Sequence, residues 1–243
     1  MPKAAPYFSD DTFKFLRALA KNNSREWFQA NKDRYETQVR GPCLRLIGDL
    51  AEPLHAISPQ ITAIAKPVGG SLFRIHRDTR FSGDKRPYKT HAGMYFSHGA
   101  AKSAARGEAG NAAFGRLDAP GFYLHVEPGA CFIGGGIWHP QPPTVKRVRD
   151  YMVSNPASWK KATRDPRFLK MFALGGDMLS RPPRGYDPEH ELIEDLKRKD
   201  FVASAQLDEA ELLRPDLVKL LSARYRLMTP MIDWLCGALD LEF

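Results

Sequence analysis

The sequence of 243 residues is poor in cysteine and has no long apolar run. Its three cysteines, Cys43, Cys131 and Cys236, lie far apart and form no Cys-x-x-Cys pair. This spacing disfavours a disulfide framework and a thiolate zinc site, so we expect reduced thiols that pack as small apolar side chains. No apolar run approaches the roughly 20 residues of a membrane-spanning helix, and no signal peptide is readable. We therefore predict a globular, cytoplasmic protein with no membrane partner.

Negative charge is also scarce, because 28 Asp and Glu stand against 36 Lys and Arg, a formal net charge of +8. This balance permits nucleic acid or another polyanion as a partner but does not require one. Residues 71–91 concentrate the positive charge, since two carboxylates, Asp78 and Asp84, accompany six cations: Arg74, Arg77, Arg80, Lys85, Arg86 and Lys89. Six positive charges less two negative ones leave a local excess of +4, which predicts a site without naming a reaction.

The hydrophobic periodicity predicts helices at the start of the chain. Residues 9–21 have the apolar spacing of one buried helix face, which includes Phe13 and Leu16. We expect a second helix that Asn23 caps. This helix should break or kink at Gly41-Pro42, because proline lacks the amide hydrogen and its ring clashes with the preceding turn.

From residue 64 the hydrophobic period changes to two, which is typical of strands. The expected strands cover residues 71–77, 94–98, 121–127 and 131–137, with a short one at 201–203. No helix between the first four is long enough for a parallel crossover. We therefore predict an α+β fold, with a mainly antiparallel sheet of about four or five strands flanked by N-terminal and C-terminal helices.

No linker or internal repeat divides the chain, so we predict a single domain over residues 7–240. Residues 99–119 contain eight alanines and four glycines, and such a segment has little to bury. We expect it to form a flexible loop within the domain, and we assign it no chemistry.

The cations of residues 71–91 repel one another unless anions lie between them. Two explanations are open: Asp78, Asp84 and Glu127 neutralise them in arginine pairs, or a vacancy remains for an external anion. Because arginine and lysine suit phosphate and carboxylate groups, the second explanation predicts a pocket for a small anionic molecule. The candidate ligand-binding residues are Arg74, Arg77, Asp78, Arg80, Asp84, Lys85, Tyr88, Lys89 and Tyr123.

A second group of polar residues lies on the expected strand 121–127. If this strand shares a sheet with 71–77, then Arg74 and His76 lie on the same face as Tyr123, His125 and Glu127. Such a group has the parts for general acid/base catalysis with stabilisation of a developing anion. The candidate catalytic residues, without assigned roles, are His125, Glu127, Asp78 and Asp84.

The same strand raises the question of a metal. His125 and Glu127, two apart on a strand, point the same way and are possible ligands. A scattered histidine is more often a structural residue, however, so we predict no metal site. No motif identifies a cofactor, and nothing in the sequence indicates an oligomeric state.

Three longer motifs carry a family resemblance. They are Arg74-x-x-Arg77-Asp78-x-Arg80-Phe81-x-x-Asp84-Lys85-x-x-Tyr88, the opening Asn23-x-Arg25-Glu26-Trp27-Phe28, and the pair Pro120-Gly121-Phe122-Tyr123 and Gly135-Gly136-Ile137-Trp138. With Lys197-Arg198-Lys199-Asp200-Phe201, they make the chain resemble the bacterial family called domain of unknown function 2461, over roughly residues 7–240. The resemblance implies a single domain and no particular activity, and it implies that the 99–119 loop is longer than is usual in the family.

Three functions remain open at this point. The first is an anion pocket, with hydrolase or transferase chemistry on the bound molecule. The second is a nucleic-acid-binding surface that adds Lys146, Arg147, Arg149 and residues 197–199 to the basic stretch. The third is an interaction module in which the ion pairs are structural. Salt separates the first two, because binding to a polyanion weakens steeply with salt concentration.

Overall fold

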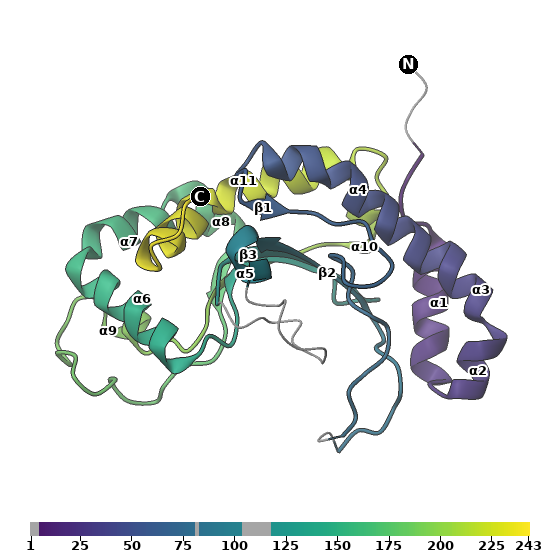
Figure 1. Cartoon of the computed structure of the whole chain (residues 1–243), viewed down its shortest axis with the longest axis horizontal. Coiled ribbons are helices and arrows are strands. Elements are labelled where there is room, and N and C mark those ends of the chain that lie inside the picture. The colour runs from purple at the N-terminus through teal and green to yellow at the C-terminus, as the bar shows by residue number, and fades with distance from the viewer. Residues whose placement is uncertain (1–4, 81–82, 104–117) are drawn as a thin grey trace.

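The computed structural model describes residues 5–80, 83–103 and 118–243 of the chain (Figure 1). At its centre is a six-stranded, antiparallel sheet in the order β1-β2-β3-β4-β6-β5. The strands are β1 (Ile61–Thr62), β2 (Ala92–His98), β3 (Gly121–Val126), β4 (Phe132–Ile137), β5 (Ala173–Gly175) and β6 (Phe201–Gln206). The predicted α+β class is confirmed, with one or two strands more than expected.

Helices precede the first strand and follow the last, as predicted, and further helices lie between the strands. The N-terminal group is α1 (Asp10–Lys21), α2 (Arg25–Ala30), α3 (Lys32–Tyr35), the π-helical turn η1 (Glu36–Arg40) and α4 (Gly41–His55). The later helices are α5 (Gly99–Ser103), α6 (Pro142–Ser154), α7 (Pro156–Thr163), α8 (Pro166–Met171), α9 (Ile193–Leu196), α10 (Glu209–Leu212) and α11 (Leu217–Ala238). No helix of the described residues combines the length and the apolar character that a membrane span requires.

One face of the sheet packs on α4 and α11, which lie together on the same side of it (Figure 1). Alternation along β3 turns Phe122 and Leu124 into this core, where both are fully buried. Close approach of α11 depends on Gly135, because a Cβ atom there would lie 2.9 Å from the Met228 sulfur. The side chains of alternate residues, Tyr123 and His125, therefore lie on the second face.

The helices before the sheet differ from the prediction at two points. Ser24 caps α2 by accepting a hydrogen bond from the Trp27 amide at 3.2 Å, so the predicted Asn23 cap is wrong. At Gly41-Pro42 the chain stays helical, because η1 takes up the irregular turn and Pro42 then lies in the first turn of α4. The Gly41 amide bonds the Glu36 carbonyl with the wider spacing of a π-helix, so the helical hydrogen bonding is already irregular where Pro42 follows.

Residues 71–77 do not form the predicted strand. Only two isolated bridges occur there, Leu72 with Met94 and His76 with Tyr88. After bonding beside β2, the chain leaves the sheet and folds back on itself, as the Arg77 amide bonds the Pro87 carbonyl at 2.9 Å. We call residues 74–80 and 83–89 together the excursion; both parts extend beyond the sheet in Figure 1.

The remaining expectations concern the alanine-rich segment and the cysteines. The first residues of the alanine-rich segment, Gly99–Ser103, form the helix α5. The predicted flexible loop falls mostly on residues 104–117, which lie outside the described part of the chain. All three cysteines are free and buried, as expected.

Candidate functional site

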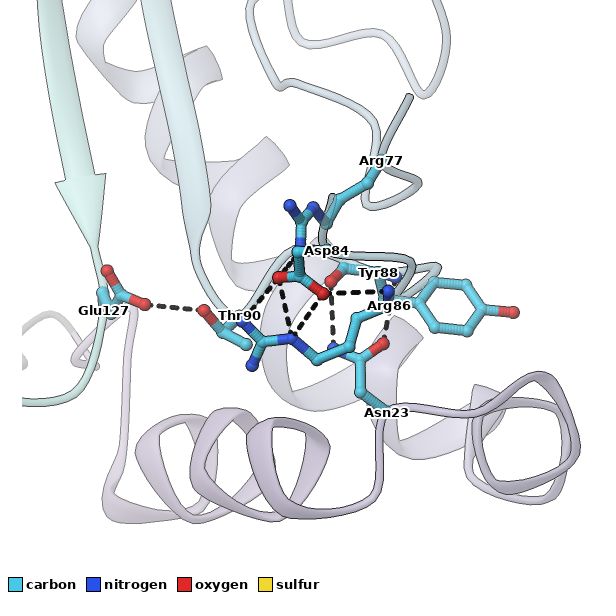
Figure 2. Close-up of polar contacts among 7 residues, drawn as sticks. All are labelled: Asn23, Arg77, Asp84, Arg86, Tyr88, Thr90 and Glu127. Carbon is cyan, nitrogen blue, oxygen red and sulfur yellow. Dashed lines mark hydrogen bonds and ion pairs between the residues drawn. The ribbon is translucent and has the colours of Figure 1, made fainter. Parts of the chain in front are cut away.

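The acidic residues of the excursion are engaged in ion pairs. Asp84 accepts hydrogen bonds from Arg86 and Arg77, and these bonds hold the pKa of its carboxyl well below its ordinary value (Figure 2). Asp78 pairs in the same way with Arg80 at 2.7 Å, and Lys85 donates to the Thr79 carbonyl at 3.0 Å. Asp78 and Asp84, both predicted as candidate catalytic groups, therefore bind neighbouring cations of the excursion.

Three cations of the excursion lack an acidic partner among the described residues: Arg74, Lys85 and Lys89. The Lys89 ammonium lies 5.1 Å from the centre of the Phe73 ring. Burial lowers the pKa of Lys89, and the charge of Arg74 lowers it further. The internal pairing of the excursion is thus incomplete.

The excursion is bound to the N-terminal helices through Asn23. The Asn23 side chain donates to the Tyr88 carbonyl at 2.9 Å and accepts from the Tyr88 amide at 3.0 Å, as a neighbouring strand would (Figure 2). The Tyr88 ring is buried and stacks on Phe28, with 4.1 Å between ring centres. The structure thus places Tyr88, a predicted ligand-binding residue, in the packing between α2 and the excursion.

A depression of about 330 Å³ lies where α2 meets the excursion. Its lining residues are Arg25, Gln29, His76, Arg77, Thr79, Pro87 and Tyr88, and none of them is acidic. Burial lowers the pKa of His76, and the charges of Arg74 and Arg25 lower it further. Positive charge therefore gathers around this depression.

Tyr123, His125 and Glu127 form a chain of hydrogen bonds on the second face of the sheet. The Tyr123 hydroxyl lies 2.9 Å from His125 Nδ1, and His125 Nε2 lies 3.0 Å from Glu127 Oε2. Only one arrangement satisfies both bonds with a neutral imidazole: Tyr123 donates to Nδ1, and Nε2–H donates to the carboxylate. Thr90 donates to the other carboxylate oxygen at 2.7 Å (Figure 2).

His91 completes this group, with its ring centre 4.2 Å from that of His125. Burial lowers the pKa of His91 to about 4, with a smaller contribution from His125. Burial raises the pKa of Glu127, but the hydrogen bonds from Thr90 and His125 outweigh it, and the net shift is downward. At neutral pH we therefore expect a neutral His91 beside an ionised Glu127.

Gly93 allows the Tyr123 ring to reach its place. Gly93 is the β2 partner of His125, and a Cβ atom there would lie 2.6 Å from the Tyr123 hydroxyl. The hydroxyl can bond His125 only because this position carries no side chain.

A model of the family described as "Conserved hypothetical protein (DUF2461)" matches residues 11–234. The chain belongs to this family. The matched range includes the whole excursion and all of the sheet. No curated protein and no solved structure matched the chain.

In this DUF2461 protein, some of the predicted juxtapositions occur and others do not. His125 and Glu127 are together, and Tyr123 is with them. His76 is not, because its ring packs 5.1 Å from Tyr88 on the excursion instead of lying on the sheet face. The expectation that Arg74 and His76 share this face through a strand at 71–77 is wrong.

Sequence reasoning missed three residues of this region, Arg25, Thr90 and His91. Arg25 belongs to a family motif, but only the tertiary contact of α2 with the excursion makes it line the depression. The pairing of Ala92 with Val126 places His91 next to Glu127. That register depends on a connection of more than twenty residues, which no local turn signal fixes.

The arrangement offers two kinds of chemistry. The depression can hold an anion, because two arginine side chains line it and no acidic residue is among its lining residues. The Tyr123–His125–Glu127 chain can move a proton from a hydroxyl to an imidazole, with the carboxylate stabilising the cation that results.

Proposed function

We propose that this DUF2461 protein binds a small molecule bearing a phosphate or carboxylate group in the depression between α2 and the excursion. The observation that carries the proposal is the lining of that depression, where Arg25 and Arg77 converge with His76 and no acidic residue lies among them. A volume of about 330 Å³ suits a small metabolite, and arginine forks suit planar carboxylates and phosphates.

Arg25 is the residue on which the proposal is best tested. It is exposed and has no ion pair within the described residues, whereas Arg77 also binds Asp84. Neutralising Arg25 should therefore remove affinity for an anion without disturbing the fold. In the bound state Arg25 and Arg77 would hold the anion, with Thr79 beside them as a neutral donor.

The experiment is a thermal shift series with inorganic phosphate and with succinate at constant ionic strength. A ligand that binds the folded state raises the unfolding temperature with its concentration. We expect this response in the wild type and in R226Q, which removes the same charge from an exposed position of α11, and a loss of the response in R25Q. Equal responses of R25Q and R226Q would refute binding in this depression.

A hydrolase or transferase activity is a second proposal. The observation that favours it is the Tyr123–His125–Glu127 chain, which supplies acid/base groups within the same part of the molecule. Turnover of a phosphate or carboxylate ester that H125N abolishes and R226Q leaves unchanged would support it. Equal turnover by H125N and the wild type would contradict it.

The nucleic-acid alternative has less support. Four of its basic residues are already paired with acids: Lys146 with Asp150, Arg147 with Asp240, Lys197 with Glu194 and Arg198 with Asp195. Binding of a DNA or RNA oligonucleotide with a steep salt dependence would favour this alternative.

A further inference from the structure

His91, His125 and Glu127 bring two imidazoles and one carboxylate to a single point of the fold. One ligand atom from each of these residues lies within 4.8 Å of the other two. We propose that they bind one divalent transition-metal ion of the kind that prefers nitrogen and carboxylate ligands, for which Zn²⁺ and Co²⁺ are suitable probes. This proposal does not depend on the anion-binding depression.

The sheet holds the ligands in place. His125 is on β3, and Glu127 follows two residues later, so both side chains point to the same face. His91 directly precedes β2, the neighbouring strand, and its ring contacts the His125 ring. The His125 ring also stacks on Phe132, with 4.7 Å between ring centres, which limits its rotation. Two neighbouring strands therefore fix the donor atoms before any ion arrives.

Outer hydrogen bonds of the kind that accompany metal ligands are already present. A ligating histidine usually bonds a protein group through its second nitrogen, and ligating carboxylates are hydrogen-bonded in turn. Here Tyr123 lies 2.9 Å from His125 Nδ1, and Thr90 donates to Glu127 Oε1 at 2.7 Å. If His125 Nε2 binds an ion, Nδ1 carries the ring proton and Nδ1–H donates a hydrogen bond to the Tyr123 oxygen.

The donor set decides which ions fit. Ca²⁺ and Mg²⁺ prefer oxygen ligands throughout, whereas imidazole with carboxylate suits Zn²⁺, Co²⁺, Fe²⁺ and Ni²⁺. Bonds of about 2.1 Å place tetrahedral ligand atoms about 3.4 Å apart, so the three side chains close in slightly around the ion. The ion then replaces the hydrogen bond between His125 and Glu127. Three protein ligands leave a fourth position open for water, as in catalytic zinc sites.

The test measures metal binding by the full chain, produced without a metal-affinity resin and stripped with a chelator. Zn²⁺ is titrated by calorimetry, and Co²⁺ is followed by its visible absorption, which reports coordination directly. We expect one ion per chain for the wild type and for H55N, which removes an exposed histidine on α4. Affinity should fall at least about tenfold in both H91N and E127Q, since each removes a ligand.

Two variants are used because E127Q also weakens a hydrogen bond to Thr90, whereas His91 is only half-buried and makes no hydrogen bond within the described residues. R25Q should bind the ion like the wild type, so a failed anion site and a failed metal site give different results. Absence of saturable binding in the wild type would overturn the proposal. Equal affinities of H91N and H55N would also overturn it, because the ions would then bind elsewhere.

Discussion

Glu127 is held from two sides by residues that are distant in the sequence. Thr90 bonds one carboxylate oxygen and His125 the other, so neither oxygen lacks a donor although the side chain is only 30% exposed. A carboxylate in such a place is stable only with donors of this kind. The position of the Glu127 side chain therefore depends on Thr90 as much as on the strand that leads to Glu127.

We predict that T90V destabilises the protein by about 1–2 kcal/mol, because valine keeps the shape of threonine but leaves one oxygen of the Glu127 carboxylate without its donor. Urea unfolding measures the loss. T90S retains the hydroxyl and is the matched control, with an expected loss well below that of T90V. Equal stabilities of T90V and T90S would show that this hydrogen bond contributes nothing.

At the scale of elements, the excursion is attached to α2 by polar and aromatic contacts. Asn23 bonds both backbone groups of Tyr88, and Phe28 stacks on the Tyr88 ring. The Asn23 side-chain amide makes the two hydrogen bonds that a neighbouring strand would make to Tyr88, because it supplies one donor and one acceptor. The walls of the depression depend on this attachment.

We predict that N23A frees the excursion locally, with a cost of about 1–3 kcal/mol from two lost hydrogen bonds. Hydrogen exchange at the Tyr88 amide should become faster, since that amide loses its acceptor. N22A is the control, because Asn22 bonds only the Ala18 carbonyl of its own helix through its side chain. Unchanged exchange at Tyr88 in N23A would contradict this account of the attachment.

The short helix α10 is joined to α11 through Glu211. This side chain bonds the Asp208 amide in a capping box and also pairs with Arg224 of α11. Burial raises the pKa of Glu211, but the bonds from Arg224 and Asp208 lower it more, and the net shift is downward. The folded state therefore binds the Glu211 proton more weakly than the unfolded state does.

A lowered folded pKa gives stability that is complete above the unfolded value near 4.5 and is lost as the pH falls through the folded value. We predict that E211Q is less stable than the wild type at about pH 6 and that the difference shrinks towards about pH 3. Urea unfolding across this range measures it. E52Q, at an exposed position of α4, should follow the wild type throughout. A pH-independent difference for E211Q would contradict the assignment.

At the scale of the whole molecule, one hydrophobic cluster extends from the N-terminal helices to the end of α11. It includes Phe13 and Leu46 at one end of the sequence and Trp159 and Leu235 at the other. Residues 71–91 carry a local excess of +4, which is half of the formal net charge of +8. A shared core favours unfolding in one step.

We predict a single cooperative transition for the whole chain, as a single domain over residues 7–240 requires. Trp27 reports on the N-terminal helices, while Trp159 and Trp234, with ring centres 4.6 Å apart, report on the C-terminal ones. W27F removes the N-terminal reporter and keeps the C-terminal pair, so the urea midpoint of its fluorescence should coincide with that of its circular dichroism, as the two should in the wild type. Separate midpoints for the two signals of one variant would indicate two domains.

The fold class can be predicted from the sequence, because helices and strands each have a local period of apolar residues. So can the family, the burial of the cysteines, and the pairing of His125 with Glu127, which lie two apart on one strand.

The two wrong predictions, the strand at 71–77 and the Asn23 cap, have the same cause, which is the contact between the excursion and the N-terminal helices. Asn23 bonds the backbone of Tyr88 instead of capping α2. Leu72 to Arg77 alternates like a strand, but residues 75–77 bond residues 87–89, and His76 packs against Phe28 of α2 instead of joining the sheet.

Contacts between residues that are distant in the sequence follow from the packing of the whole chain. Sequence spacing cannot place Arg25 beside Arg77, because that contact joins a helix to the excursion. Nor can it place His91 beside His125, because the register of β2 on β3 is set by the core that Met94, Phe96 and Phe122 form together. A shift of one residue would turn those side chains out of the core, and burial therefore fixes the register and, with it, the histidine pair.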